Sequence, residues 1–264
     1  MIGSTYTGPA ATGVFAPAPG AAPLTVMIRA QAVLETKMLL RNGEQLLLTV
    51  VIPALLLVLF SGVDIVNTGS GKSVDFLAPG ILALAVLSTA FTGQAIATGF
   101  ERRYGVLKRL GASPLPRWAL LTAKTASVLV TEVLQVALLT VIAFALGWSP
   151  HGNPFAVLLL LLLGTAAFSG LGLLMAGTLK AEATLAAANL VFLLLLVGGG
   201  VIVPMDKFSG GVQSVLKLLP ISALSDGLRD VLQHGAAMPW GDLGILAVWA
   251  VVGLAAAARF FRWE

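Results

Sequence analysis

The stretch "GSGKS", residues 69–73, has the residue types of a phosphate-binding loop. A P-loop also needs a Gly five positions before the Gly of its Gly-Lys pair, and a helix directly after its Ser. Counting back from Gly71 gives Val66, and we predict no helix directly after Ser73. We therefore interpret the stretch as an ordinary Gly/Ser turn and predict no nucleotide site in it.

The two histidines, His151 and His234, fall in predicted loops and lack the spacing of metal ligands. The chain has no cysteine, which excludes disulfides, thiol chemistry and Cys-based zinc sites. The acidic residues lie mostly at the ends of apolar stretches, and they suggest no Ser/His/Asp combination. We predict no catalytic residue and no metal site.

Glu132 is an acid in the middle of a long apolar stretch, with Gln135 one turn later and Lys124 two turns earlier. An ionisable residue inside a membrane span is a functional candidate by default. Two interpretations stay open: structural pairing with a polar group such as Asn189, or lining of a transport pathway or gate. A single buried acid is too little for a proton-driven transporter, which usually needs a relay.

Residues 101–117, "ERRYGVLKRLGASPLPR", hold one acid and five cations in a chain that is only 11% charged. Each Arg or Lys at a helix centre costs roughly 2.5–3.5 kcal/mol on the insertion scale, so this stretch must lie in water. Its apolar residues recur at helical spacing and predict a short amphipathic helix that ends near Gly111. The helix is either a topology anchor or a surface that docks a partner. The residues on its predicted apolar face are Phe100, Tyr104, Leu107 and Leu110.

The composition identifies an integral membrane protein, because 58% of the residues are hydrophobic and charged residues are less than half as frequent as in soluble proteins. Apolar runs of 18 or more residues predict helices that span the bilayer. Of the 16 Lys and Arg residues, 12 fall on the side that holds both termini and 4 on the other, which makes the termini cytoplasmic. The six predicted spans are about 46–66, 76–98, 118–147, 155–179, 183–203 and 243–260.

Three further segments complete the predicted organisation. Residues 1–23 are rich in Ala, Pro, Gly and Thr and predict a disordered cytoplasmic tail. Residues 24–45 predict a helix along the inner membrane surface, although a plain cytoplasmic helix remains an alternative. The outer segment 204–240 predicts a re-entrant pair of short helices, the first ending at Pro220 and the second capped by Ser222 or Ser225, or else a solvated loop.

This order of elements resembles the membrane permease subunit of ABC-2-type ABC exporters, and among them the daunorubicin-resistance-type multidrug exporters. Three stretches carry the resemblance: "FERRYGVLKRLGASPLPRWALLTAK", "VPMDKF…LLPISALSDGLRDVLQHG" and the closing "RFFRWE". The resemblance covers residues 24–264. It implies an all-α polytopic fold of the type V exporter kind, with six transmembrane helices in residues 46–264, an interfacial connecting helix, a cytoplasmic coupling helix and an outer re-entrant helix pair.

The resemblance also implies partners that the residues alone do not. It implies a second permease subunit, identical or homologous, and a separate cytoplasmic ABC ATPase that binds ATP and Mg, so that this chain is not itself an enzyme. We expect it in a bacterial cell membrane, in contact with lipids and not with nucleic acid. The coupling residues implied are Glu101, Arg102, Arg103, Tyr104, Gly105, Leu107, Lys108 and Arg109, with Tyr104 and Leu107 filling a pocket of the ATPase. The pathway or gate candidates are Glu132, Gln135 and Asn189, and the outer segment is marked by Pro204, Pro220 and Arg229.

The function predicted from the resemblance is ATP-driven export of a drug or another hydrophobic or amphiphilic compound. One alternative on the same scaffold is export of a cell-wall lipid or lipid-linked polysaccharide. A second alternative is a membrane scaffold or regulator that transports nothing. A secondary transporter is disfavoured, because the sequence shows neither an internal repeat nor interrupted helices in matching halves.

Overall fold

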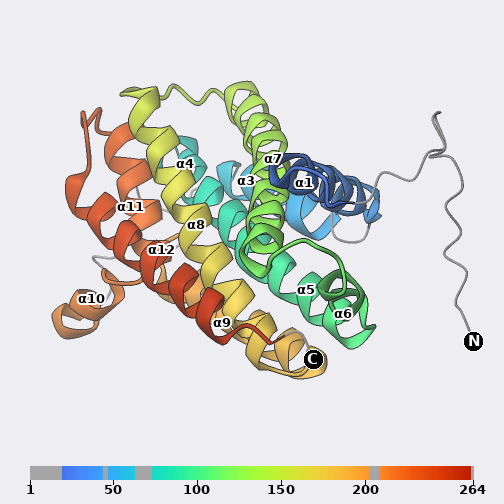
Figure 1. Ribbon diagram of the computed structural model, residues 1–264. Coiled ribbons are helices and arrows are strands. Elements are labelled where there is room, and N and C mark those ends of the chain that lie inside the picture. The colour runs from blue at the N-terminus through green and yellow to red at the C-terminus, as the bar shows by residue number, and fades with distance from the viewer. Residues whose placement is uncertain (1–19, 44–46, 63–72, 202–208, 263–264) are drawn as a thin grey trace, which may run out of the picture.

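The computed structural model describes residues 20–43, 47–62, 73–201 and 209–262, and every regular element in these ranges is a helix. Predictions for residues 1–19, for Pro204 and for most of the "GSGKS" turn lie outside the described residues. Figure 1 shows the helices, whose bounds are α1 (Leu24–Arg41), η1 (Leu47–Val51), α3 (Ile52–Ser61), α4 (Ser73–Val86), η2 (Leu87–Gly93), α5 (Gln94–Arg103), α6 (Val106–Gly111), α7 (Arg117–Ala145), α8 (Pro154–Thr178), α9 (Ala181–Gly198), α10 (Gly210–Leu216), α11 (Pro220–Leu232) and α12 (Trp240–Phe260).

Five helical runs among the described residues are long and apolar enough to cross a bilayer. They correspond to the second to sixth predicted spans and are Ser73–Arg103, Trp118–Ala145, Pro154–Thr178, Ala181–Gly198 and Trp240–Phe260. The first predicted span contains a shorter apolar helix, Thr49–Ser61, and its ends lie outside the described residues. The chain is therefore an all-helical, multi-pass membrane protein over the described residues, and the first predicted span, 46–66, stays a prediction.

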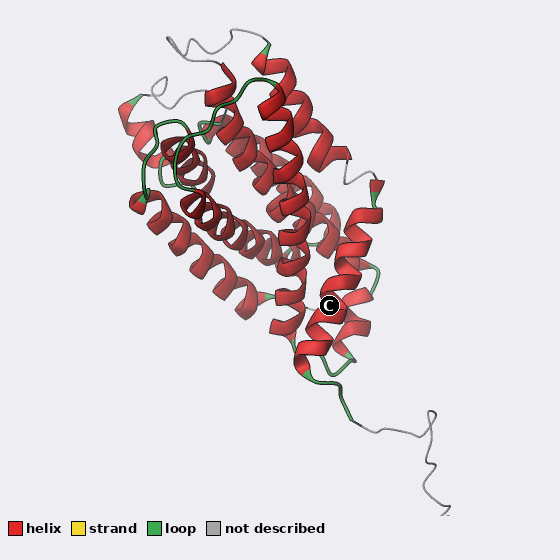
Figure 2. Cartoon of the chain, turned by 90° about the horizontal axis from the view of Figure 1, so that it is seen from above, coloured by secondary structure: helices red, strands yellow, loops and turns green. Residues whose placement is uncertain are grey.

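The central helix of the bundle is formed by α4, η2 and α5, which run on without a break. Its most apolar window is 83% buried, whereas α9 and α12 bury only 17% and 28% of theirs, so the outer helices turn most of their apolar surface outward. Figure 2 shows the bundle from above. The segment η2 is π-helical, a wider turn that occurs often at functional sites.

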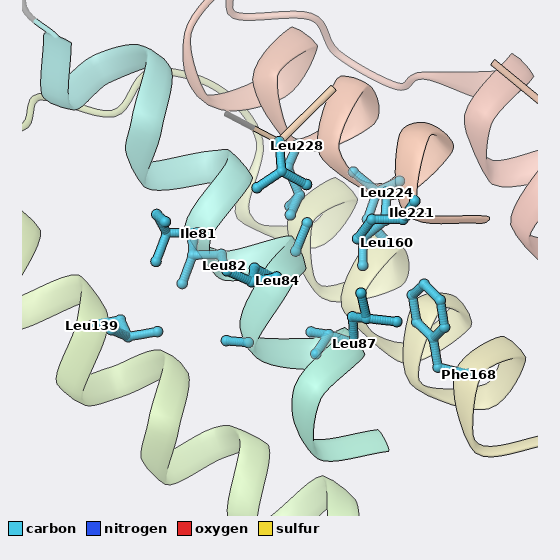
Figure 3. Close-up of a cluster of buried hydrophobic side chains, with 14 of the residues drawn as sticks. Ile81, Leu82, Leu84, Leu87, Leu139, Leu160, Phe168, Ile221, Leu224 and Leu228 are labelled. Carbon is cyan, nitrogen blue, oxygen red and sulfur yellow. The ribbon is translucent and has the colours of Figure 1, made fainter. Parts of the chain in front are cut away.

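Two packing arrangements hold the other helices around this centre. Helices α8 and α12 lie side by side along much of their length (Figure 1). A Cβ at Gly170 would lie 2.5 Å from the backbone nitrogen of Leu254, so only glycine permits this close approach. Leucines from α4, η2, α7, α8 and α11 meet in the main apolar core, together with Phe168 of α8 (Figure 3).

The outer helix pair differs from its prediction in the position of Pro220, which begins the second helix of the pair. Pro220 is the first residue of α11 and does not end the helix before it, because a proline at this position loses no intrahelical hydrogen bond. Ser222 and Ser225 consequently lie inside α11, buried, and neither is its N-cap. Helix α11 is buried against α4, α8 and α12, whereas α10 has no buried residue. The pair therefore consists of one core helix and one peripheral helix.

Candidate functional site

The basic stretch folds as a sharp turn, which we call the elbow (residues 101–111). Helix α5 ends at Arg103, and Gly105 adopts a left-handed conformation with φ of 70° before α6 begins. The prediction of one continuous helix from Phe100 to Leu110 is therefore wrong. A left-handed residue costs about 1–2 kcal/mol for any side chain other than glycine, so Gly105 is where the helix breaks.

The elbow is anchored mainly by the apolar side chain of Leu107. Leu107 is fully buried in a small cluster with Leu115 just before α7, Leu120 in the first turns of α7 and Phe261 after α12. Leu110 packs against the same cluster. The expectation that Leu107 fills a partner's pocket is therefore wrong, because the chain's own helices already enclose it. Tyr104 is 67% exposed and remains available to a partner.

The cations of the elbow divide into two groups. Arg102 donates to the carbonyl of Leu179 just beyond the C-terminus of α8, where the helix dipole favours a positive charge. Arg103 forms an ion pair with Glu182 of α9 and lies 6.0 Å from the centre of the Tyr104 ring. Lys108 and Arg109 are exposed on α6. The outward face of the elbow is thus positively charged and carries one exposed aromatic ring.

Glu101 faces the opposite way and belongs to a charged triad of Glu35, Glu101 and Lys124. The Lys124 ammonium lies 3.0 Å from Glu35 of α1 and 2.5 Å from Glu101 at the end of α5. All three side chains are largely buried, with exposed fractions of 4% for Lys124, 9% for Glu35 and 14% for Glu101. The triad therefore ties the elbow to α1 and α7 through contacts that are costly to break.

Sequence reasoning missed the role of Glu35. The available signal was an acid that interrupts the apolar stripe of a predicted surface helix. Such an acid needs a buried cation nearby, but the pattern does not say which one. The partner lies 89 residues away in the chain.

The three pathway candidates do not form one site. Glu132 accepts a hydrogen bond from Thr165 of α8, not from Asn189 as suggested. Gln135 accepts from Thr89 of η2 at 2.8 Å and donates to the carbonyl of Thr49. Asn189 donates to its own helix at Leu185, 3.0 Å away, and is exposed. Glu132 instead joins α7 to α8, and Gln135 joins α7 to η2 and η1.

Asn189 lines a groove of about 660 Å³ between η1 and α3 on one side, η2 and α5 in the middle, and α9 on the other. The groove is mostly apolar, with hydroxyl and amide groups spaced along it. The Thr92 hydroxyl is buried and has no hydrogen-bond partner among the residues that the structure describes. The polar residues on the wall of the groove are Asn42, Thr49, Ser88, Thr92, Tyr104 and Asn189.

Arg229 of α11 occupies a buried position at the other end of the bundle. Its guanidinium donates to the carbonyl of Val201 at 2.9 Å and of Phe76 at 3.4 Å, and it pairs with Asp226 at 3.3 Å. It also stacks 4.0 Å from the centre of the Phe76 ring. Burial lowers the pKa of Arg229 to about 10, and the Asp226 carboxylate opposes that shift, so Arg229 stays charged at neutral pH. Arg229 thus holds α11 against the start of α4.

The remaining sequence candidates are the Gly/Ser turn and the two histidines. Helix α4 begins at Ser73, so the expectation that no helix follows the Gly/Ser turn is wrong; Val66 still breaks the P-loop pattern. The ring of His234, in the turn after α11, lies 3.2 Å from the carboxyl group of Asp230 near the end of α11. Within the described ranges, no three His, Cys, Asp or Glu side chains come close enough to hold a metal ion.

Comparison with known proteins agrees with this architecture. Residues 63–259 match the family described as "ABC-2 family transporter protein". The chain is 24% identical to "Putative transport permease YvfS" of Bacillus subtilis (strain 168) over 239 residues, which cover 86% of this chain and 93% of that protein.

A second relative is "Linearmycin resistance permease protein LnrN" of the same organism. It is 28% identical over 167 residues, which cover 61% of this chain and 43% of that protein. Permeases of this kind are transporter membrane subunits that generally work with an ATPase partner. The family match extends over most of the chain and includes the elbow, the triad residues of α5 and α7, and α11. The chain belongs to the ABC-2 transporter family.

Proposed function

We propose that this chain is the membrane permease subunit of an ATP-driven exporter of hydrophobic or amphiphilic compounds, drugs among them. ATP and Mg bind to a separate ATPase subunit, which docks on the elbow from the cytoplasm. The observation that carries the proposal is the elbow itself. Its outward face is cationic, and its inner face is tied by Leu107 and by Glu101 to α1, α7 and α12.

The anchoring explains how a push on the elbow reaches the membrane. The elbow continues directly from α5, the last part of the central helix, so a displacement of the elbow acts on the helix that packs against most others. The buried triad makes α1 and α7 move with it, because separating the charges would leave them unpaired in a poorly hydrated site. Motion of the ATPase thereby becomes tilting of helices.

The groove supports an amphiphilic cargo. Its walls include Ile52 and Leu185, which are 41% and 39% exposed on helices that face outward, so the groove is open toward the lipid. Side chains such as Ser88 and Asn189 offer hydrogen bonds inside the otherwise apolar groove. A second permease subunit, identical or homologous, placed over α3 and α9 would close the groove into a pathway.

The first test concerns the ATPase. Purification of the tagged chain from its native membrane should recover an ABC ATPase in about equal amount. Reversing Lys108→Glu and Arg109→Glu together should reduce the recovered ATPase about tenfold, because charge-assisted contacts to its acids are lost. The control reverses Lys180→Glu and Arg259→Glu, two exposed cations outside the elbow. Equal ATPase recovery from the elbow variant and wild type would refute docking at the elbow.

A second test separates the classes of cargo. The complex reconstituted in vesicles should move a fluorescent amphiphilic dye when ATP is added, and Ser88→Leu with Asn189→Leu should slow it by narrowing the groove. Transport of a lipid-linked saccharide with no transport of the dye would favour the cell-wall alternative. If the complex hydrolyses ATP but transports neither the dye nor the lipid-linked saccharide, the export proposal is wrong.

A further inference from the structure

A second cavity, of about 280 Å³, lies among α1, α5 and α7. We call it the triad cavity, because Glu35, Glu101 and Lys124 form part of its wall. It is distinct from the groove, but the two share the wall residues Asn42, Ala97, Phe100 and Tyr104. The exposed ring of Tyr104 marks the edge where the triad cavity reaches the surface.

Two polar side chains of α5 line this cavity without a partner. Gln94 is 4% exposed and Thr98 is 1% exposed, and both wall the triad cavity. The amide nitrogen and oxygen of Gln94 and the hydroxyl of Thr98 have no hydrogen-bond partner in the described part of the chain. Buried polar groups are rarely left in this state, since each costs free energy until it is paired. Gln94, Thr98 and Glu101 are spaced by four and three residues and so share one face of the helix.

Among the residues that the structure describes, the charged side chains of the cavity wall sum to one negative unit. Two carboxylates, Glu35 and Glu101, share the single ammonium of Lys124, and no other charged side chain of the described residues lines the cavity. The second oxygen of Glu35 accepts a hydrogen bond from the neutral amide of Gln31, 2.8 Å away, which does not change the sum. A ligand with one positive charge would balance the site.

The apolar part of the wall indicates what that charge is attached to. Met38, Leu39, Phe100 and Val128 line the same cavity, and the rings of Phe100 and Tyr104 stack with centres 6.1 Å apart. The volume is many times the roughly 10–15 Å³ that a single water needs by the same measure. An ammonium group on an apolar body suits this combination, because carboxylates, a hydroxyl, an amide oxygen and ring faces all attract such a cation.

We propose that the triad cavity binds the ammonium group of an amphiphilic amine, whose apolar body extends past Phe100 and Tyr104 into the groove. This inference rests on the proposed export function and names its cargo class: a molecule with one positive charge beside an apolar part. The hydroxyl of Thr98 and the amide oxygen of Gln94 accept hydrogen bonds from the ammonium, and Glu101 supplies the opposing charge.

Binding can be measured on the purified chain in detergent with three probes of equal size. These are 2-phenylethylammonium, neutral 2-phenylethanol and anionic phenylacetate, titrated by calorimetry. We expect the cation to bind about tenfold or more tightly than either of the others, as expected for hydrogen bonds that involve a charged group. Equal binding of all three probes, or no binding of the cation, would mean that the cavity holds only water and would overturn the proposal.

Two variants locate the site. Thr98→Val keeps the shape and removes an unpartnered hydroxyl, so it should leave the melting temperature unchanged and weaken binding of the cation about tenfold. Glu101→Gln removes one negative charge and should weaken it at least as much. Glu182→Gln is the matched control, because it neutralises an exposed acid at the same end of the bundle. If Glu101→Gln does not fold, Thr98→Val decides alone: unchanged affinity in Thr98→Val would refute the site.

The binding test is independent of the ATPase. Loss of the proposed export function would show as hydrolysis without dye movement in vesicles, whereas failure of the ammonium site would show as absent selectivity among the three probes. A chain that exports neutral dye and binds no cation selectively would retain the function and lose this inference.

Discussion

Lys124 and Arg229 are buried cations at opposite ends of the bundle, and the two ends neutralise them differently. Lys124 is held by two carboxylates from two other helices, α1 and α5. Arg229 is held by two backbone carbonyls, an aromatic ring and Asp226 of its own helix, whose side chain is 32% exposed. At the elbow end, the helices are therefore joined by buried charges that each need the opposite charge as a partner. At the α11 end, the cation is held by groups that are neutral or partly exposed to water.

The difference matters for what happens when the cation is lost. Removing Lys124 strands two buried negative charges, while removing Arg229 strands two carbonyl groups and a carboxylate that water already reaches. A junction of the first kind resists separation of its helices, which suits a part that transmits force. A junction of the second kind fastens α11 to the start of α4 without linking distant helices by charge.

The largest predicted effect is that of Lys124→Met. It should lower the free energy of unfolding by about 3–5 kcal/mol, because it leaves Glu35 and Glu101 buried without a cation. Thermal melting of the purified protein measures this, with Lys180→Met, an exposed cation, as the control. Adding Glu35→Gln and Glu101→Gln to the same chain should recover most of the loss. No recovery would show that packing, not charge, holds this junction.

Arg229→Met should have a smaller effect, about 2–3 kcal/mol, because the carbonyls of Val201 and Phe76 lose a charged donor. The measurement is the same melting experiment, and Arg229→Lys provides a variant that keeps the charge but not the several donors of the guanidinium. A loss as large as that of Lys124→Met would erase the proposed difference between the two ends.

Gly105→Ala comes next, at about 1–2 kcal/mol, because alanine strains the left-handed turn between α5 and α6. Gly241→Ala in α12 is the control, since a Cβ at Gly241 meets only open space and its φ is ordinary. The two melting temperatures are compared. If Gly105→Ala is neutral, α5 and α6 have joined into one helix, and ATPase recovery should then fall with it.

The smallest predicted change in stability is that of Arg103→Gln at the exposed pair with Glu182. Exposed ion pairs contribute about 0–1 kcal/mol, so the melting temperature should hardly move. Any stabilisation by the pair should weaken further in high salt. If Arg103→Gln lowered stability as much as Arg229→Met, the pair of Arg103 and Glu182 would contribute like a buried ion pair, which would contradict its exposure.

Local properties of the sequence were enough to predict the helical class and the position of five membrane runs. Span length, apolar composition and the cost of placing cations in lipid depend only on neighbouring residues, and they located both the runs and the elbow. The same reasoning failed where a residue has two local roles: Pro220 could end one helix or begin the next, and Gly105 could sit within a helix or break it. Packing of α11 and α6 against the bundle chose between them.

Composition and periodicity therefore predicted a polytopic helical protein with a cation-rich stretch outside the lipid, because insertion energies are set along the chain. They could not establish that Glu35, Glu101 and Lys124 meet, that Leu107 points inward, or that Gln94 and Thr98 face a cavity. Those facts depend on contacts between helices far apart in sequence, where burial removes water and makes the choice of partner decide the free energy.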